Sequence, residues 1–145
     1  MKRAIIFIAT GAYSGYFPVA PGTAGTLVGV ILYLFLYRLH PLFYLIIIIL
    51  LFFLGVWLSG EAENILNKKD PGYIVIDEIV GFLMTMFLLP EGVWFIIGGF
   101  FLFRLLDILK PFQQIERIKG GLGVMLDDIV AGILANLILQ SFRLF

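Results

Sequence analysis

The apolar run L-F-Y-L-I-I-I-I-L-L-F-F-L-G-V-W-L, residues Leu42–Leu58, decides the fold of this chain. It contains no charged residue, and its length approaches the ~20 residues that a helix needs to cross a bilayer. Four shorter apolar segments lie at Leu27–Tyr37, Ile79–Leu89, Val93–Leu106 and Ile129–Phe142. These reach only about 16–24 Å as helices, so their polar ends must lie near the membrane interface or inside a local cavity. The sequence therefore predicts an all-α fold, a polytopic membrane bundle of about four to five short apolar helices.

The composition of the whole chain agrees with a lipid environment. The 145 residues are 61% hydrophobic and 14% charged, against about 45–50% and about 25% in ordinary domains, and the mean hydropathy is +1.07. We expect a single membrane domain, residues 1–145. The net charge is zero, so no basic surface indicates nucleic-acid binding. There is no cysteine, and the single histidine, His40, lies beside Pro41; both facts argue against thiolate, histidine-nucleophile and histidine-rich zinc chemistry.

The N-terminal segment resembles a signal peptide superficially. Lys2 and Arg3 precede a short apolar run, Ala4–Ala12, which continues into glycine- and proline-containing sequence without a clear cleavage site. We interpret it as part of the mature protein.

The loops between the apolar segments differ in charge. Turn residues at Pro41 and Pro90–Gly92 predict antiparallel helix hairpins. One side of the bundle comprises the N-terminal segment through Gly22 and the loops Ser59–Ile76 and Lys110–Leu126. That side holds eight Lys and Arg residues and the other holds two: Lys2, Arg3, Lys68, Lys69, Arg104, Lys110, Arg117 and Lys119 against Arg38 and Arg143. This bias places the N-terminus in the cytoplasm.

Five of the ten carboxylates form three groups, each at the end of an apolar stretch: Asp77 with Glu78, Asp107, and Asp127 with Asp128. Ionised acids beside such segments are costly unless something compensates their charge. In the topology set by Lys and Arg, all three groups meet at the cytoplasmic interface. Clustered carboxylates without cysteine or a suitable histidine favour Mg²⁺. The sequence therefore predicts a metal site that faces the cytoplasm.

Two of these groups also have purely structural explanations. Asp77 and Glu78 can cap the start of a helix by interacting with its free backbone N–H groups. Arg104, Asp107 and Lys110 follow one another at i, i+3 and i+6, so they can form a salt-bridge ladder at the membrane interface. Alternatively, Asp107 holds a metal ion while Arg104 and Lys110 contact phosphate oxygens.

The third acidic group ends the glycine-containing stretch G-G-L-G-V-M-L-D-D, Gly120–Asp128. Its glycines allow the backbone to approach an anion or another helix closely. Two adjacent acids at the head of a hydrophobic helix repel each other, so a bound cation would explain the arrangement. Beyond them, Ala131, Gly132 and Ala135 predict a face of small residues for tight helix packing.

A second glycine-containing segment is F-P-V-A-P-G-T-A-G-T, Phe17–Thr26. We expect a restrained loop that enters a helix, where Thr23, Thr26 and exposed N–H groups could hold phosphate. The spacing does not match the Walker P-loop. A plain loop followed by a helix-packing face at Gly25 and Gly29 explains the segment equally well.

Four blocks of the chain together resemble the phosphatidylglycerophosphatase A family. In order, they are P-G-T-A-G-T (21–26), D-P-G-Y-I-V-I-D-E-I-V-G (70–81), F-R-L-L-D-I-L-K-P (103–111) and G-G-L-G-V-M-L-D-D-I-V-A-G (120–132). The resemblance implies a Mg²⁺-dependent phosphatase that removes the terminal phosphate of phosphatidylglycerophosphate, leaving phosphatidylglycerol, in phospholipid biosynthesis. It also implies an all-helical protein of the bacterial inner membrane.

On this interpretation, the metal ligands and catalytic acids come from one set: Asp77, Glu78, Asp107, Asp127 and Asp128. Arg104 and Lys110 would neutralise the phosphate oxygens, with Thr23 and Thr26 as further positioning groups. The metal ion would activate water and stabilise charge on the leaving alkoxide. One acid could instead act as a general base or form an aspartyl-phosphate, but no D-x-D-x-T type motif is present, which favours water.

Other classes of function compete with this one. A small ion or solute transporter with an acidic pathway would usually hold its site near the bilayer midplane, whereas these acids are expected at one interface. A non-enzymatic assembly subunit could use the same charges to anchor helix ends. A related hydrolase acting on another phospholipid or a soluble phosphate ester also stays open, as do the number of metal ions and the oligomeric state.

Overall fold

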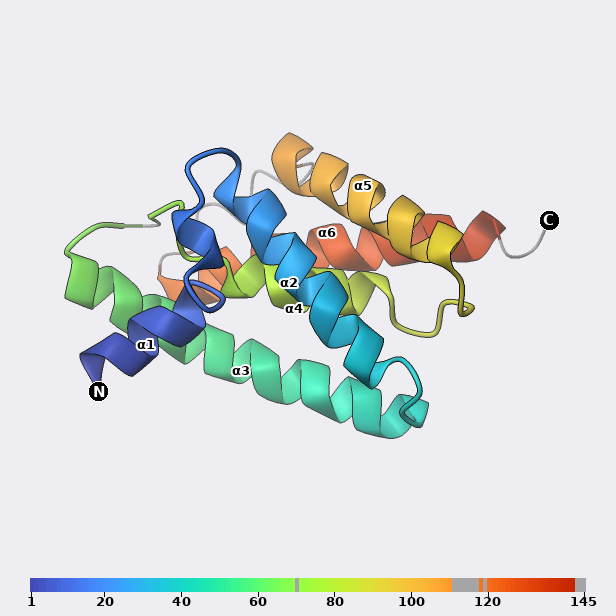
Figure 1. The fold of residues 1–145 in the computed structure, drawn as a ribbon, viewed down its shortest axis with the longest axis horizontal. Helices are drawn as coiled ribbons and strands as arrows, with labels where there is room; N and C mark the ends of the chain where they lie inside the picture. Colours follow the sequence, from blue (N-terminus) through green and yellow to red (C-terminus); the bar gives the residue numbers. More distant parts are fainter. Residues whose placement is uncertain (70, 111–117, 119, 143–145) are drawn as a thin grey trace.

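The computed structural model is all-α, as the sequence predicts (Figure 1). It describes residues 1–69, 71–110, 118 and 120–142. The helices of this part of the chain are α1 (Lys2–Ala9), the 3-10 helix η1 (Ser14–Tyr16), α2 (Pro21–Leu36), α3 (Pro41–Leu66), α4 (Ile76–Thr85), α5 (Val93–Leu109) and α6 (Gly121–Phe142). Each of the five predicted segments forms a helix, and α1 is additional, so the count of four to five was too low. Arg117, Lys119 and Arg143, which entered the charge count, lie outside the described residues.

Two helices extend furthest beyond the apolar segments that predicted them. α3 continues past Leu58 to Leu66, and α6 begins at Gly121 instead of Ile129. The predicted loops at Ser59–Ile76 and Lys110–Leu126 are therefore partly helical. The α3 extension contains Ala, Glu and Leu, which favour helix even where the sequence turns polar. The start of α6 was hidden by glycines, which usually indicate a loop.

The short helix α4 lies at the centre of the bundle. It contacts α2, α3, α5 and α6, and Figure 1 shows it between α2 and α6. Most of its residues are buried: Ile76, Ile79, Val80, Gly81, Phe82, Leu83 and Thr85. Because other helices pack around α4, the acids of its first turn, Asp77 and Glu78, are partly buried.

Small residues allow the close packing of α4 and α6. Ala131, Gly132 and Ala135 of α6 are buried, which confirms the predicted small-residue face. A Cβ atom built on Gly132 would lie 2.4 Å from the carbonyl oxygen of Gly81 in α4. The two backbones therefore approach more closely than any side chain at residue 132 would allow.

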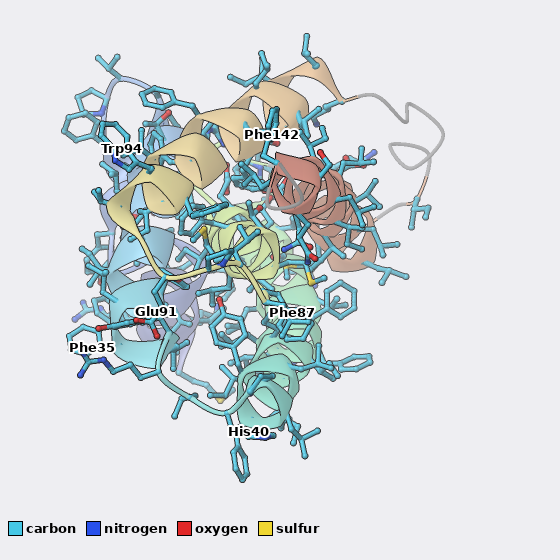
Figure 2. All side chains as sticks on the ribbon, turned by 90° about the vertical axis from the view of Figure 1, so that its right-hand side faces the viewer. Phe35, His40, Phe87, Glu91, Trp94 and Phe142 are labelled. Carbon is cyan, nitrogen blue, oxygen red and sulfur yellow. The ribbon has the colours of Figure 1, made fainter. Side chains whose placement is uncertain are left out.

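The outer surface of the bundle is apolar. Within the described residues, α3 and α6 are long and apolar enough to cross a membrane, by length and composition, and α2 is a shorter apolar helix. Phe35 and Trp94 are each 79% exposed, and both project outward from the bundle in Figure 2. Large exposed apolar side chains on several helices are typical of a surface that contacts lipid.

The contact between α3 and α6 gives a stability prediction. A Cβ atom at Gly121 would lie 2.1 Å from the carbonyl oxygen of Val56, so Gly121→Ala must push α6 away from α3. We expect a loss of about 1–3 kcal/mol in the free energy of unfolding. Thermal unfolding in detergent, followed by circular dichroism, measures the change.

The matched control is Gly60→Ala on the facing helix, because a Cβ atom there has nothing within 4 Å. Alanine in a helix interior is favoured over glycine by about 0.5–1 kcal/mol, so this variant should be neutral or slightly more stable. Equal melting temperatures for the two variants would contradict the close packing of α3 and α6.

Candidate metal centre

Three helices bring the five predicted acids to one cavity. Asp77 and Glu78 lie in the first turn of α4, Asp107 near the end of α5, and Asp127 and Asp128 in α6. All five line a cavity of about 250 Å³, together with Lys110, Gly72, Ile74, Ile108 and Val124. The sequence therefore predicted correctly that the three groups meet.

The closest group within this cavity consists of Asp77, Glu78 and Asp128, which we call the acidic triad. One carboxylate oxygen from each lies within 4.8 Å of the other two. Oδ2 of Asp128 and Oε2 of Glu78 are buried and have no hydrogen-bond partner in the described part of the chain. Such buried oxygens cost free energy unless a donor or a cation satisfies them. Three carboxylates provide oxygen-only ligands, which fit a hard cation such as Mg²⁺.

The electrostatics of the triad also favour a cation. Glu78 belongs to α4, which is not one of the two candidate membrane spans. Burial raises the pKa of the Glu78 carboxyl well above its usual range, and the neighbouring charge of Asp77 raises it further. A divalent cation at the triad would offset both effects, because it stabilises the ionised form of each ligand.

The acids of α4 lie in its first turn and not at its N-cap position. The N-cap residue is Val75, which makes no side-chain cap hydrogen bond. Asp77 and Glu78 are therefore first-turn acids near the positive end of the helix, as the structural explanation expected in part. The backbone N–H of Val75 instead donates to the carbonyl oxygen of Ala9, at 2.9 Å, which holds the start of α4 against α1.

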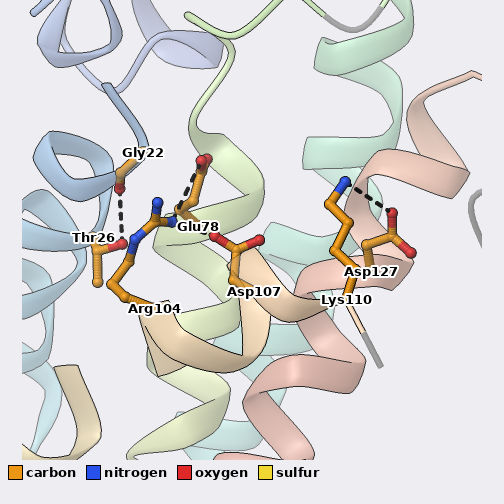
Figure 3. Close-up of polar contacts among 7 residues, drawn as sticks. All are labelled: Gly22, Thr26, Glu78, Arg104, Asp107, Lys110 and Asp127. Atoms are coloured by element: carbon orange, nitrogen blue, oxygen red, sulfur yellow. Dashed lines mark hydrogen bonds and ion pairs between the residues drawn. The ribbon is translucent and has the colours of Figure 1, made fainter. Parts of the chain in front are cut away.

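The predicted ladder along α5 divides into two groups of ion pairs, one around Arg104 and one at Lys110 (Figure 3). Arg104 pairs with Asp107 one turn away, and its Nη1 atom also lies 3.8 Å from Oε1 of Glu78. Lys110 lies instead 3.8 Å from Oδ2 of Asp127 on α6. Lys110 ends α5 in the left-handed conformation, with φ of 43°, so it is not part of the same regular helical face.

This division separates the two cations by environment. The guanidinium of Arg104 is largely buried between two carboxylates, with its side chain 14% exposed, whereas the side chain of Lys110 is 41% exposed. Lys110 also lines the cavity, and Arg104 does not. Lys110 is therefore better placed than Arg104 to meet a ligand that enters the cavity.

The glycines of the P-G-T-A-G-T block face α4 and the acidic triad. A Cβ atom at Gly22 would lie 2.4 Å from Oε1 of Glu78 and 2.8 Å from Nη2 of Arg104. A Cβ atom at Gly25 would lie 2.5 Å from Cβ of Val75. The predicted helix-packing face at Gly25 and Gly29 is confirmed, because both glycines are buried against α4. The loop predicted to extend to Thr26 is wrong in its second half, because α2 already begins at Pro21. The role of Gly22 was not predicted: its lack of a side chain leaves room for the pair of Glu78 and Arg104. Its spacing of three residues before Gly25 could have indicated that both glycines lie on one packed face of a helix.

The threonines of the same block lie beside the cavity wall and not in the wall itself. Thr26 is buried, and its hydroxyl donates to the carbonyl oxygen of Gly22 at 2.8 Å. Neither Thr23 nor Thr26 is among the residues that line the cavity. Their contact with phosphate stays a prediction.

Comparisons with known proteins give a consistent result. Residues 7–143 match the family described as Phosphatidylglycerophosphatase A. A Phosphatidylglycerophosphatase A of Haemophilus influenzae is 38% identical over 144 residues, which cover 96% of this chain and 88% of that protein. The protein of the same name in Escherichia coli is 35% identical over 132 residues, with coverages of 88% and 77%.

Another relative carries a different name. A Bacteroides thetaiotaomicron protein, provisionally named a phosphatidylinositol-3-phosphatase, is 37% identical over 148 residues, with coverages of 95% of this chain and 92% of that protein. No solved structure is similar enough to this chain to give a match.

The position of Gly22 leads to a prediction about cation binding. In Gly22→Ala the new methyl group must displace Glu78 or Arg104, so the triad loses its arrangement. We expect the affinity for Mn²⁺, used as a paramagnetic substitute for Mg²⁺, to fall about 10–100-fold, as when a partner of a metal ligand is lost. Electron paramagnetic resonance of free Mn²⁺ measures this affinity.

Gly98→Ala is the matched control, since its Cβ atom would make an ordinary 3.5 Å contact with Leu139. That variant should bind Mn²⁺ like the unchanged protein. If Gly22→Ala also binds normally, the pair of Glu78 and Arg104 does not position the triad.

Proposed function

This chain belongs to the phosphatidylglycerophosphatase A family of phosphatases, and on that premise we propose that it hydrolyses the terminal phosphate monoester of phosphatidylglycerophosphate. The observation that carries the proposal is the acidic triad in a cavity that also contains Lys110. Metal-assisted hydrolysis of a phosphate ester requires two parts. Carboxylates bind the divalent metal ion, and a positively charged side chain contacts the phosphate oxygens.

Asp77, Glu78 and Asp128 would hold the Mg²⁺ ion. When bound, it supplies a Lewis acid that lowers the pKa of a coordinated water and stabilises charge on the leaving oxygen. Lys110 exchanges its contact with Asp127 for a phosphate oxygen, which fixes the orientation of the monoester. Asp127, no longer in contact with Lys110, can then accept a proton from the attacking water.

The overall reaction adds water across one ester bond. The water oxygen bonds to phosphorus, the bond from phosphorus to the glycerol oxygen breaks, and the leaving oxygen takes up a proton. Arg104 does not need to contact the phosphate in this scheme, because it neutralises Asp107 and Glu78. Arg104 therefore reduces the net negative charge of the cavity, so that an anionic substrate can enter.

The place of action that fits this reaction is the cytoplasmic membrane of a bacterium, with the cavity facing the cytoplasm. The excess of Lys and Arg on the loops at the cavity end supports this orientation. The two helices long enough to cross a bilayer, α3 and α6, support a membrane-embedded protein. A headgroup phosphate would then reach the acids without leaving the bilayer surface.

A phosphoinositide monoester is the second candidate substrate. The relative from Bacteroides thetaiotaomicron, provisionally named a phosphatidylinositol-3-phosphatase, supports it. Both lipids present a phosphate monoester on a headgroup, so the same triad could serve either. Phosphate release from phosphatidylglycerophosphate, phosphatidylinositol 3-phosphate, phosphatidic acid and glycerol phosphate, each with and without Mg²⁺, separates the candidates. We expect phosphatidylglycerophosphate to give the highest kcat/KM, and a preference for any other substrate would overturn the assignment.

The triad should be essential for this activity. Asp128→Asn keeps the size of the side chain but removes its charge, so it should lower Mg²⁺-dependent kcat at least about 100-fold and raise the Mg²⁺ concentration required. Glu61→Gln on α3 is the control, because Glu61 is not among the residues of the cavity, and its activity should be unchanged. Full activity of Asp128→Asn at the usual Mg²⁺ concentration would exclude the triad as the metal site.

A further inference from the structure

A row of aromatic rings covers the surface of α1, η1 and the segment before α4. The ring centroids of Phe7 and Tyr13 lie 5.2 Å apart, those of Tyr13 and Tyr16 lie 6.1 Å apart, and Tyr16 stacks on Tyr73 at 5.1 Å. Lys68 extends the row, with Nζ 5.7 Å from the centre of the Tyr73 ring. We call Phe7, Tyr13, Tyr16 and Tyr73 the aromatic row.

Three rings of the aromatic row, those of Phe7, Tyr13 and Tyr16, are exposed, as are residues that follow Tyr16. Tyr13 is 51% exposed, Tyr16 48%, Phe17 59% and Val19 72%. Tyrosine has an apolar ring and a polar hydroxyl, so it is stable where one end of the side chain is dry and the other is wet. Exposed tyrosines next to exposed Phe17 and Val19 are therefore typical of the boundary between lipid chains and headgroups.

The charge of this surface fits an anionic bilayer. Residues 1–26 contain Lys2 and Arg3 and no acidic residue, and Lys68 lies against the last ring of the row. α1 packs on α3 through Ile5 and Ala9 and leaves most of its other side chains exposed. A short helix that buries one stripe and presents basic and apolar residues is suited to the membrane interface.

The aromatic row includes Tyr73, which lies in the segment just before α4 and its acids. A Cβ atom at Gly15 would lie 2.0 Å from the carbonyl oxygen of Tyr73, so η1 lies directly on the backbone at Tyr73. The residues on either side of it, Gly72 and Ile74, line the acidic cavity. The depth of the row in a bilayer therefore also sets the depth of the cavity.

We propose that the aromatic row, with Lys2, Arg3 and Lys68, is a lipid-contacting surface that lies at the headgroup level of an anionic bilayer and holds the acidic cavity at that depth. A monoester phosphate on a lipid headgroup would then reach the triad while its acyl chains stay in the bilayer. This consequence for substrate entry rests on the proposed function, whereas the depth of the surface does not.

The absence of cysteine from the sequence makes the test direct, because a single introduced cysteine takes up a single nitroxide spin label. Val19→Cys is the main variant, since residue 19 is highly exposed and outside the aromatic row, and Tyr16→Cys is the second. Leu50→Cys, 63% exposed on α3, gives the reference for the hydrocarbon region, and the free spin label in buffer gives the reference for water. The full chain is reconstituted in phosphatidylcholine vesicles with and without phosphatidylglycerol.

Power saturation then compares the accessibility of each label to oxygen, which concentrates in the hydrocarbon, and to a neutral nickel chelate, which stays in water. We expect residues 16 and 19 to lie between the two references in both vesicle types. A ratio of oxygen to nickel accessibility equal to that of the free label, or equal to that of residue 50, would overturn the proposal.

The anionic preference is tested with the same label. Phosphatidylglycerol should lower the nickel accessibility at residue 19 by about twofold, and the double change Lys2→Gln and Arg3→Gln should abolish that difference. An equal accessibility in both vesicle types would refute the charged part of the surface. Because these measurements need no substrate, an inactive protein with residue 19 at headgroup depth would contradict the proposed reaction and leave the lipid-contacting surface standing.

Discussion

The mutual repulsion of buried carboxylates is the constraint on which the rest of this structure depends. One oxygen from each of Asp77, Glu78 and Asp128 lies within 4.8 Å of the other two, and these side chains are buried or partly buried in an apolar bundle. Water cannot screen these charges as it does at a surface, so their ionised forms require compensation from nearby cations. Arg104 supplies one part, beside Glu78 and Asp107, and Lys110 supplies another, beside Asp127. A divalent cation at the triad would complete the balance, and this requirement connects the fold to phosphate chemistry.

Close approach of helix backbones makes this arrangement possible. Gly22 gives space to the pair of Glu78 and Arg104, and Gly132 lets α6 approach α4 at Gly81. Without these contacts the first turn of α4 and the middle of α6 could not share a cavity. The glycines therefore contribute to the site through geometry, although none of them needs to contact a ligand.

Much of the fold was predictable because its signals are local. Apolar runs such as Leu42–Leu58 predict helices whatever surrounds them. The acids Asp77, Asp107 and Asp128 identify the parts of three helices that converge. Helix α1 was not predicted, because its apolar stretch is short and is stabilised by tertiary contacts of Ile5 and Ala9. The start of α6 was also missed, since Gly121 weakens a helix on its own and is tolerated only because it touches α3.

The details of the site depend on three-dimensional contacts that spacing alone does not determine. Positions 104, 107 and 110 predicted one ladder, but the left-handed conformation of Lys110 moves its amine to Asp127. Similarly, Thr26 fitted a phosphate-binding loop by type, while the structure uses its hydroxyl within α2. The role of Gly22 depends on Arg104, which is far from it in sequence.

Asp77, Glu78 and Asp128 should together hold one divalent cation. Anomalous diffraction at the manganese absorption edge, from crystals of the protein grown with Mn²⁺, locates such an ion. We expect an anomalous peak between these three side chains, with carboxylate oxygens at about 2.0–2.3 Å from the metal. Manganese bound only at other carboxylates, or nowhere on the protein, would show that the triad is not the metal site.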